Sequence, residues 1–128
     1  MRITAIYAAI LAGLFIALSI RVISARRGAR VALGDGGGEH LKRRIRAHAN
    51  FAEYVPLALI LLGLAESLRT GPVMVHAIGI VLVTGRFVHA VGISRAPETM
   101  ALRVTGMSLT FAAIGGAALA CLVASAMT

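Results

Sequence analysis

Residues 43–56 read RRIRAHANFAEYVP and place charged and amide side chains at the start of an otherwise apolar segment. At about 100° per residue, four further side chains lie within roughly a quarter-turn of Arg43 on one helical face: Arg46, Asn50, Glu53 and Tyr54. An ionisable side chain costs roughly 2.5–3.5 kcal/mol at the centre of a bilayer unless it is paired or hydrated. This polar face therefore needs a partner, either within the chain or as a bound ligand.

The composition places this helical face in a membrane protein. The chain has 128 residues, which predicts a single domain over 1–128. It is 59% hydrophobic, well above the roughly 45–50% that is usual for soluble domains, and its mean hydropathy is +0.88.

The net charge of +8 is concentrated in residues 21–46, which indicates a basic segment facing anionic lipid. No basic–aromatic pattern suited to stacking bases is present, so we expect no nucleic-acid partner. A single cysteine excludes a disulfide framework and a thiolate metal site.

Four segments are long and apolar enough to cross about 30 Å of hydrocarbon: residues 3–22, 47–68, 73–93 and 102–127. The first segment is longer than the apolar core of a signal peptide and is followed by arginines rather than a cleavage site. It also holds no acidic residue, which argues against a small proton-coupled multidrug transporter. The predicted fold class is therefore all-α, a four-transmembrane-helix bundle.

The connections between these segments predict an orientation. The segment before the second helix is basic and contains the flexible glycine run at 34–38. A second arginine-containing connection spans 94–100, whereas residues 69–72 form a tight turn. Because positively charged loops stay in the cytoplasm, both termini are expected outside.

Three polar clusters are expected near the cytoplasmic face: the arginines that end the first helix, the 43–54 face, and Arg86 and His89 together with Arg103. Snorkelling accounts for arginines at helix ends but not for Asn50 and Glu53, which lie inside an apolar helix. Glu53 could form a structural ion pair with Arg46 or Arg86. A ligand site is the favoured interpretation, because the cations outnumber the one carboxylate. Arginines bind carboxylates bidentately and Glu53 could bind an amine, so the ligand would be anionic and peptide-like.

The pattern Arg43-x-x-Arg46-x-x-x-Asn50-x-x-Glu53-Tyr54-x-Pro56 resembles the signature of the membrane-associated proteins in eicosanoid and glutathione metabolism, the MAPEG superfamily. The segment VISARRGARV at 22–31 resembles the end of the first helix in the leukotriene C4 synthase branch. Four helices with a basic first loop extend the resemblance over nearly the whole chain.

This resemblance implies a homotrimer in a bacterial inner membrane, with glutathione as co-substrate at the subunit interfaces. It assigns the tripeptide to eight residues: Arg26, Arg43, Arg46, Asn50, Glu53, Tyr54, Arg86 and His89. The expected activity is transfer of the thiol to a lipophilic electrophile, or reduction of a lipid peroxide. Arg103 would stabilise the nucleophilic thiolate, since an adjacent cation depresses a thiol pKa.

Two departures from the leukotriene branch leave alternatives open. His89 and Ile93 stand where that branch has ligand-binding tyrosines, and the connection before the fourth helix is longer. Arg95 therefore remains a second candidate for thiol activation. The alternative function is a catalytically inactive membrane scaffold or lipid-interacting trimer.

Overall fold

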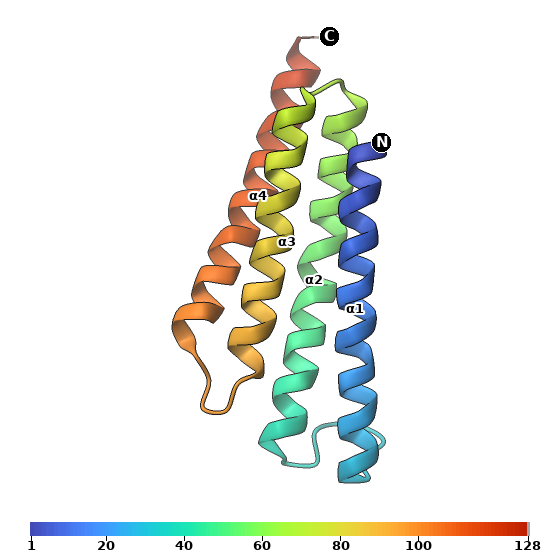
Figure 1. Ribbon diagram of the computed structural model, residues 1–128, viewed down its shortest axis with the longest axis vertical. Coiled ribbons are helices and arrows are strands. Elements are labelled where there is room, and N and C mark those ends of the chain that lie inside the picture. The colour runs from blue at the N-terminus through green and yellow to red at the C-terminus, as the bar shows by residue number, and fades with distance from the viewer. Residues whose placement is uncertain (128) are drawn as a thin grey trace.

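The computed structural model describes residues 1–127 as four long antiparallel helices (Figure 1). These are α1 (Arg2–Ala29), α2 (Glu39–Ser67), α3 (Pro72–Ser94) and α4 (Met100–Ala126). All four are long and apolar enough to cross a membrane, which confirms the predicted all-helical class. The N-terminus and the α2–α3 turn lie at one end of the bundle, called here the terminal end. The α1–α2 and α3–α4 connections lie at the other, called here the arginine-rich end (Figure 1).

The first two helices are longer than the apolar segments that predicted them. The helix α1 continues to Ala29 and α2 begins at Glu39, so much of the expected basic loop is helical. Hydropathy detects the part of a helix that is in lipid, whereas arginine, lysine and glutamate continue a helix equally well in water. With 28 residues, α1 is about 42 Å long at 1.5 Å per residue, more than the hydrocarbon thickness. Its last turns and the first turns of α2 extend past the ends of α3 and α4 (Figure 1).

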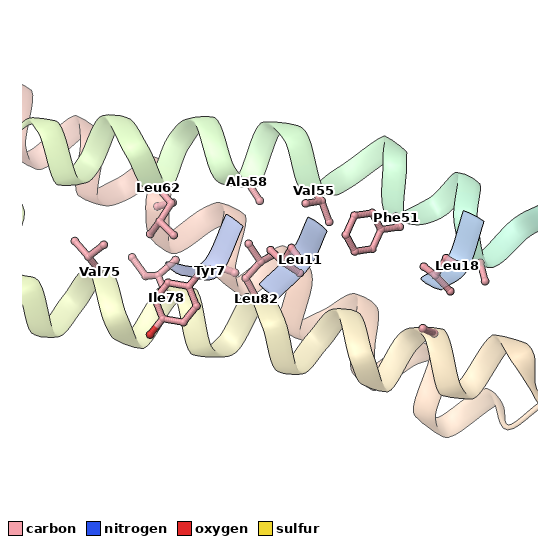
Figure 2. Close-up of a cluster of buried hydrophobic side chains, with 14 of the residues drawn as sticks. Tyr7, Leu11, Leu18, Phe51, Val55, Ala58, Leu62, Val75, Ile78 and Leu82 are labelled. Atoms are coloured by element: carbon pink, nitrogen blue, oxygen red, sulfur yellow. The ribbon is translucent and has the colours of Figure 1, made fainter. Parts of the chain in front are cut away.

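The core is formed by one apolar face from each helix. Tyr7, Leu11 and Leu18 of α1 pack against α2 and α3 (Figure 2). Most of the remaining core residues come from the two central helices, and α4 adds the small residues Ala113 and Ala117. Large apolar side chains elsewhere on α1 and α4 are exposed, as expected for surfaces that face lipid or another copy of the chain.

Glycines allow α3 and α4 to approach closely at the arginine-rich end. A Cβ on Gly106 would overlap the backbone of His89, and a Cβ on Gly92 would lie 2.6 Å from the amide nitrogen of Arg103. Small residues at such positions let membrane helices come into backbone contact. This contact brings the first turns of α4, which carry Arg103, against the last turns of α3, which carry Arg86 and His89.

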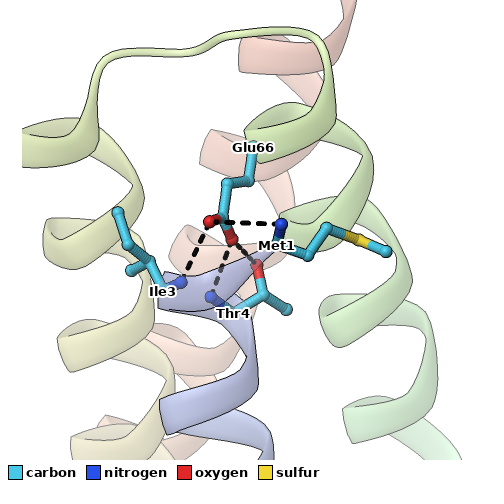
Figure 3. Close-up of polar contacts among 4 residues, drawn as sticks. All are labelled: Met1, Ile3, Thr4 and Glu66. Atoms are coloured by element: carbon cyan, nitrogen blue, oxygen red, sulfur yellow. Dashed lines mark hydrogen bonds and ion pairs between the residues drawn. The ribbon is translucent and has the colours of Figure 1, made fainter.

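A carboxylate from α2 caps the N-terminus of α1 at the terminal end (Figure 3). Glu66 accepts hydrogen bonds from the backbone amides of Ile3 (2.9 Å) and Thr4 (2.8 Å) and from the Thr4 hydroxyl (2.7 Å). The first amides of a helix have no partner within the helix, and a negative charge beside them is favourable. Glu66 therefore accepts hydrogen bonds from the first amides of α1 and links α1 to α2.

Candidate functional site

Arg86 is the most deeply buried charged side chain in the part of the chain that the structure describes, at 1% exposure. It donates to the Asn50 side-chain oxygen at 2.7 Å and to the Thr110 hydroxyl at 3.3 Å, and its guanidinium lies 5.7 Å from the centre of the Phe51 ring. All of these partners are neutral, and the Arg86 Nε is buried without a partner. Arg86 thus joins α2, α3 and α4 and fixes the orientation of Asn50.

His89 completes this buried cluster one turn along α3. It is 1% exposed, and its Nδ1 lies 3.4 Å from an Arg86 nitrogen. The backbone of Gly106 covers it from α4. His89 therefore lies behind Arg86 within a single copy, rather than on an open surface.

Glu53 pairs with Arg46 rather than with Arg86. The Arg46–Glu53 distance is 3.9 Å, and each side chain is about half exposed, at 51% and 52%. Tyr54, on the same helix, lies edge-on to Phe111 of α4, with 5.5 Å between the ring centres. An exposed ion pair contributes roughly 0–1 kcal/mol, so this pair can open for a ligand at little cost.

A pocket of about 320 Å³ lies between α2 and the start of α4 at the arginine-rich end. Its charged lining residues are four cations and two carboxylates: Lys42, Arg43, Arg46 and Arg103, with Glu39 and Glu98. Glu98 binds Arg103 at 2.6 Å and Arg43 at 3.6 Å. The cations exceed the carboxylates by two, so the pocket favours an anion.

The structure places Arg103 in this pocket and leaves Arg95 outside its lining. Arg95 contributes only its backbone carbonyl, which accepts a hydrogen bond from Arg43 at 3.3 Å. Arg26 is also separate from the cluster, because its guanidinium donates to the Gly34 carbonyl at 2.7 Å and so holds the α1–α2 loop. The nine predicted site residues therefore fall into groups: the pocket lining holds Arg43, Arg46 and Arg103, and the buried cluster holds Asn50, Arg86 and His89. Glu53 and Tyr54 lie on α2 outside both groups, and Arg26 lies at the α1–α2 loop.

Three residues of the site were missed from the sequence. Thr110 and Met107 hold the Arg86 guanidinium from α4, and Glu98 holds Arg103. Met107 lies four residues after Arg103, and Thr110 lies four residues after Gly106, so helical spacing from these two positions was the available signal. No sequence pattern indicates the pairing of Glu98, since it depends on the conformation of residues 95–99.

Taken together, the geometry defines a four-helix membrane protein with a pocket at one end that is rich in cations, near a buried arginine and a fixed amide. Comparison with known proteins gives the family. The MAPEG family model matches residues 4–123, so the chain belongs to the MAPEG family. It is 38% identical over 112 residues to the inner membrane protein YecN of Escherichia coli K12, covering 88% of this chain and 84% of that protein. The same values hold for YecN of Escherichia coli O6:H1.

These relatives are named as inner membrane proteins, in agreement with the four helices capable of spanning a membrane. Both chain ends that the structure describes lie at the terminal end, and both arginine-rich connections lie at the opposite end (Figure 1). Which end faces the cytoplasm stays a prediction from the distribution of arginines.

Proposed function

We propose that this protein binds glutathione in the pocket between α2 and α4 and uses its thiolate against lipophilic electrophiles. The observation that carries the proposal is the surplus of cations around this pocket, four against two carboxylates. Glutathione has two carboxylates and one ammonium group, which matches the surplus of cations in the pocket together with Glu53, a half-exposed carboxylate beside Arg46 on α2. Membership of the MAPEG family supports the same ligand.

Each side chain then has a distinct task. Arg43 and Arg46, which line the pocket, bind the carboxylates. The ligand would extend from the pocket along α2, where Glu53 binds the ammonium group and Asn50 and Tyr54 hydrogen-bond the peptide backbone. Arg86 and His89 act from behind, because Arg86 holds the Asn50 oxygen at 2.7 Å. Arg103 stabilises the thiolate. An ordinary thiol has a pKa of about 8.5, and a neighbouring guanidinium raises the fraction of reactive thiolate at neutral pH.

In the transfer reaction, the thiol first loses its proton to solvent. The thiolate then forms a carbon–sulfur bond with the electrophile, and a leaving group such as halide departs with the bonding electron pair. In the peroxidase reaction, two molecules of glutathione reduce one lipid hydroperoxide to the alcohol and water, and they are themselves oxidised to the disulfide. Both substrates are lipophilic and would enter from the bilayer.

A homotrimer is part of this proposal. Arg46 and Glu53 are half exposed in one copy, and Arg26 points to its own loop. A neighbouring copy would cover the exposed face of α2 and could bring its Arg26 to the ligand, as the family resemblance implies. The exposed apolar surface of α1 and α4 is compatible with contacts to lipid and to other copies.

The alternative is a membrane scaffold or lipid-interacting protein that has the fold without turnover. One contact favours it: Glu98 already pairs with the Arg103 guanidinium at 2.6 Å, so a thiolate would have to compete with this carboxylate. Ligand binding without thiol-dependent turnover over a broad panel of electrophiles would support this alternative.

The test is calorimetric titration of the detergent-solubilised protein with glutathione, followed by an assay of conjugation to a hydrophobic halogenated arene. We expect saturable binding at millimolar glutathione or below. Arg46→Gln should weaken it about tenfold, as for loss of a charge-assisted hydrogen bond. Arg27→Gln is the matched control, because Arg27 is an exposed arginine of the same end outside the pocket. No binding by the wild type, or equal binding by both variants, would contradict the proposal.

A further inference from the structure

A second basic pocket lies on the opposite side of α2, between α1 and α2. It has a volume of about 290 Å³ and shares no lining residue with the pocket of Arg103. Ser24 and Gly28 line it from α1, and Gly38, His40 and Arg44 line it from the start of α2. It is therefore a separate site, formed where these two helices extend beyond α3 and α4.

The charge in this pocket is unbalanced. Arg44 is its only arginine, and no aspartate or glutamate lines it. Two acidic residues lie nearby in the sequence, but neither faces this pocket: Asp35 accepts a hydrogen bond from the Gly37 amide at 2.8 Å, and Glu39 lines the other pocket. Within residues 1–127, Arg44 forms none of the ion pairs.

The hydrogen bonds of Arg44 leave it incompletely satisfied. One terminal nitrogen donates to the Arg21 carbonyl at 3.2 Å, and the Nε is buried without a partner. Arg21 lies beside it and donates to the Ser94 hydroxyl at 3.1 Å, again a neutral oxygen. Two neighbouring guanidinium groups, neither with a carboxylate, make a strong attraction for an anion.

The surroundings indicate the class of anion. The residues of α1 directly before Ser24 include the exposed apolar side chains Ile16, Ile20 and Ile23, which are 51–59% exposed. Ile16 and Ile20 precede the lining residue Ser24 in four-residue steps, so this stripe leads to the Ser24 rim of the pocket. An amphiphile with an acidic head group and acyl chains fits this arrangement, because its head can reach Arg44 while its chains follow α1.

We propose that the pocket of Arg44 binds the phosphate of an anionic membrane phospholipid. The guanidinium of Arg44 would bind the phosphate oxygens, and His40 and Ser24 would hydrogen-bond the head group. Arginine suits this role because its planar fork can bind two phosphate oxygens at once. The site does not depend on glutathione binding, since the two pockets lie on different sides of α2.

The experiment is native mass spectrometry of the purified full-length protein in detergent, titrated with phosphatidylglycerol or with phosphatidylcholine. We expect phosphatidylglycerol to bind more tightly than phosphatidylcholine. Arg44→Gln should weaken phosphatidylglycerol about tenfold or more, whereas Arg44→Lys should restore part of the affinity. Arg27→Gln removes the same charge from the same end and should cost about fivefold or less, as for general attraction to an acidic lipid.

Three results would overturn the proposal. Equal affinity of Arg44→Gln and the wild type would show that the pocket is not the site. Equal losses in Arg44→Gln and Arg27→Gln would show general surface attraction. A third arm adds inorganic phosphate at millimolar concentration: if it displaces phosphatidylglycerol and raises the unfolding temperature as much as the lipid does, the site binds free phosphate instead. The unfolding temperature of each variant without lipid checks that it is folded.

Discussion

The two ends of the bundle differ in how completely their charges are paired. At the terminal end, the one carboxylate of Glu66 accepts three hydrogen bonds at 2.7–2.9 Å from α1 (Figure 3). At the arginine-rich end, the pocket of Arg103 has two more cations than carboxylates, and the Arg46–Glu53 ion pair is half exposed and long, at 3.9 Å. Both ends hold charges on membrane helices, which are costly unless they are satisfied.

This difference separates charges that hold the helices together from charges that are free to bind a ligand. Glu66 has partners for both carboxylate oxygens within the chain, so its role is to hold helices together. Apart from Arg103, which pairs with Glu98 at 2.6 Å, the arginines of the other end have longer, exposed or purely neutral contacts, so they can exchange these partners for an anion. Variants at the two ends should therefore affect different measurements: stability at the terminal end, and binding and turnover at the arginine-rich end.

The largest effect is expected for Arg103→Ala. If Arg103 stabilises the thiolate, its loss should lower the conjugation rate roughly 100–1000-fold, the range for removing one preorganised charge-stabilising donor. The pH at which the conjugation rate rises should also shift upward, because the bound thiol would regain a pKa closer to about 8.5. The measurement is kcat as a function of pH with saturating glutathione.

Arg95→Ala tests the alternative activator in the same assay. Because Arg95 lies outside the lining of the pocket, its replacement should leave the dependence of kcat on pH the same as in the wild type. A large loss in Arg95→Ala together with normal turnover in Arg103→Ala would reverse the assignment.

The next effect is on stability, at the terminal end. Glu66→Ala leaves the amides of Ile3 and Thr4 without their acceptor and should cost about 2–3 kcal/mol of unfolding free energy. Glu66→Gln keeps an acceptor oxygen and should cost less. Denaturant unfolding in detergent measures both. Glutathione affinity should stay unchanged in Glu66→Gln, and a loss there would mean that the two ends are not independent.

Much of the fold and part of the site could be predicted from the sequence. The four apolar segments gave the helices, and the spacing of Arg46, Asn50, Glu53 and Tyr54 gave one face, because both depend on residues close together in the chain. Asn50 and Arg86 are in contact, as expected for polar groups on apolar helices that face the bundle interior.

The remaining features depend on contacts between distant residues or on loop conformation. Nothing near Glu66 in the sequence indicates that it caps a helix 62 residues away. Arg26 was expected beside a ligand, yet in one copy it holds the Gly34 carbonyl, because the loop of 30–38 folds back over the end of α1. The first helix was predicted to end near residue 22 and the second to begin near residue 47, whereas α1 ends at Ala29 and α2 begins at Glu39. Hydropathy detects only the part of a helix that is apolar enough to lie in lipid.

The smallest effect, and the sharpest test of how free the arginines are, concerns Glu98. Its carboxylate is the strongest internal competitor for Arg103 and also pairs with Arg43. Glu98→Gln should therefore tighten glutathione binding about two- to fivefold, as expected for release of a partly exposed ion pair. Glu39→Gln is the matched control, because Glu39 lines the same pocket but pairs with neither arginine. If both variants gain equally, the pocket responds only to net charge. If Glu98→Gln binds glutathione more weakly than the wild type, Glu98 positions Arg103 for the ligand instead of competing with it, and the guanidinium is less available than its surroundings imply.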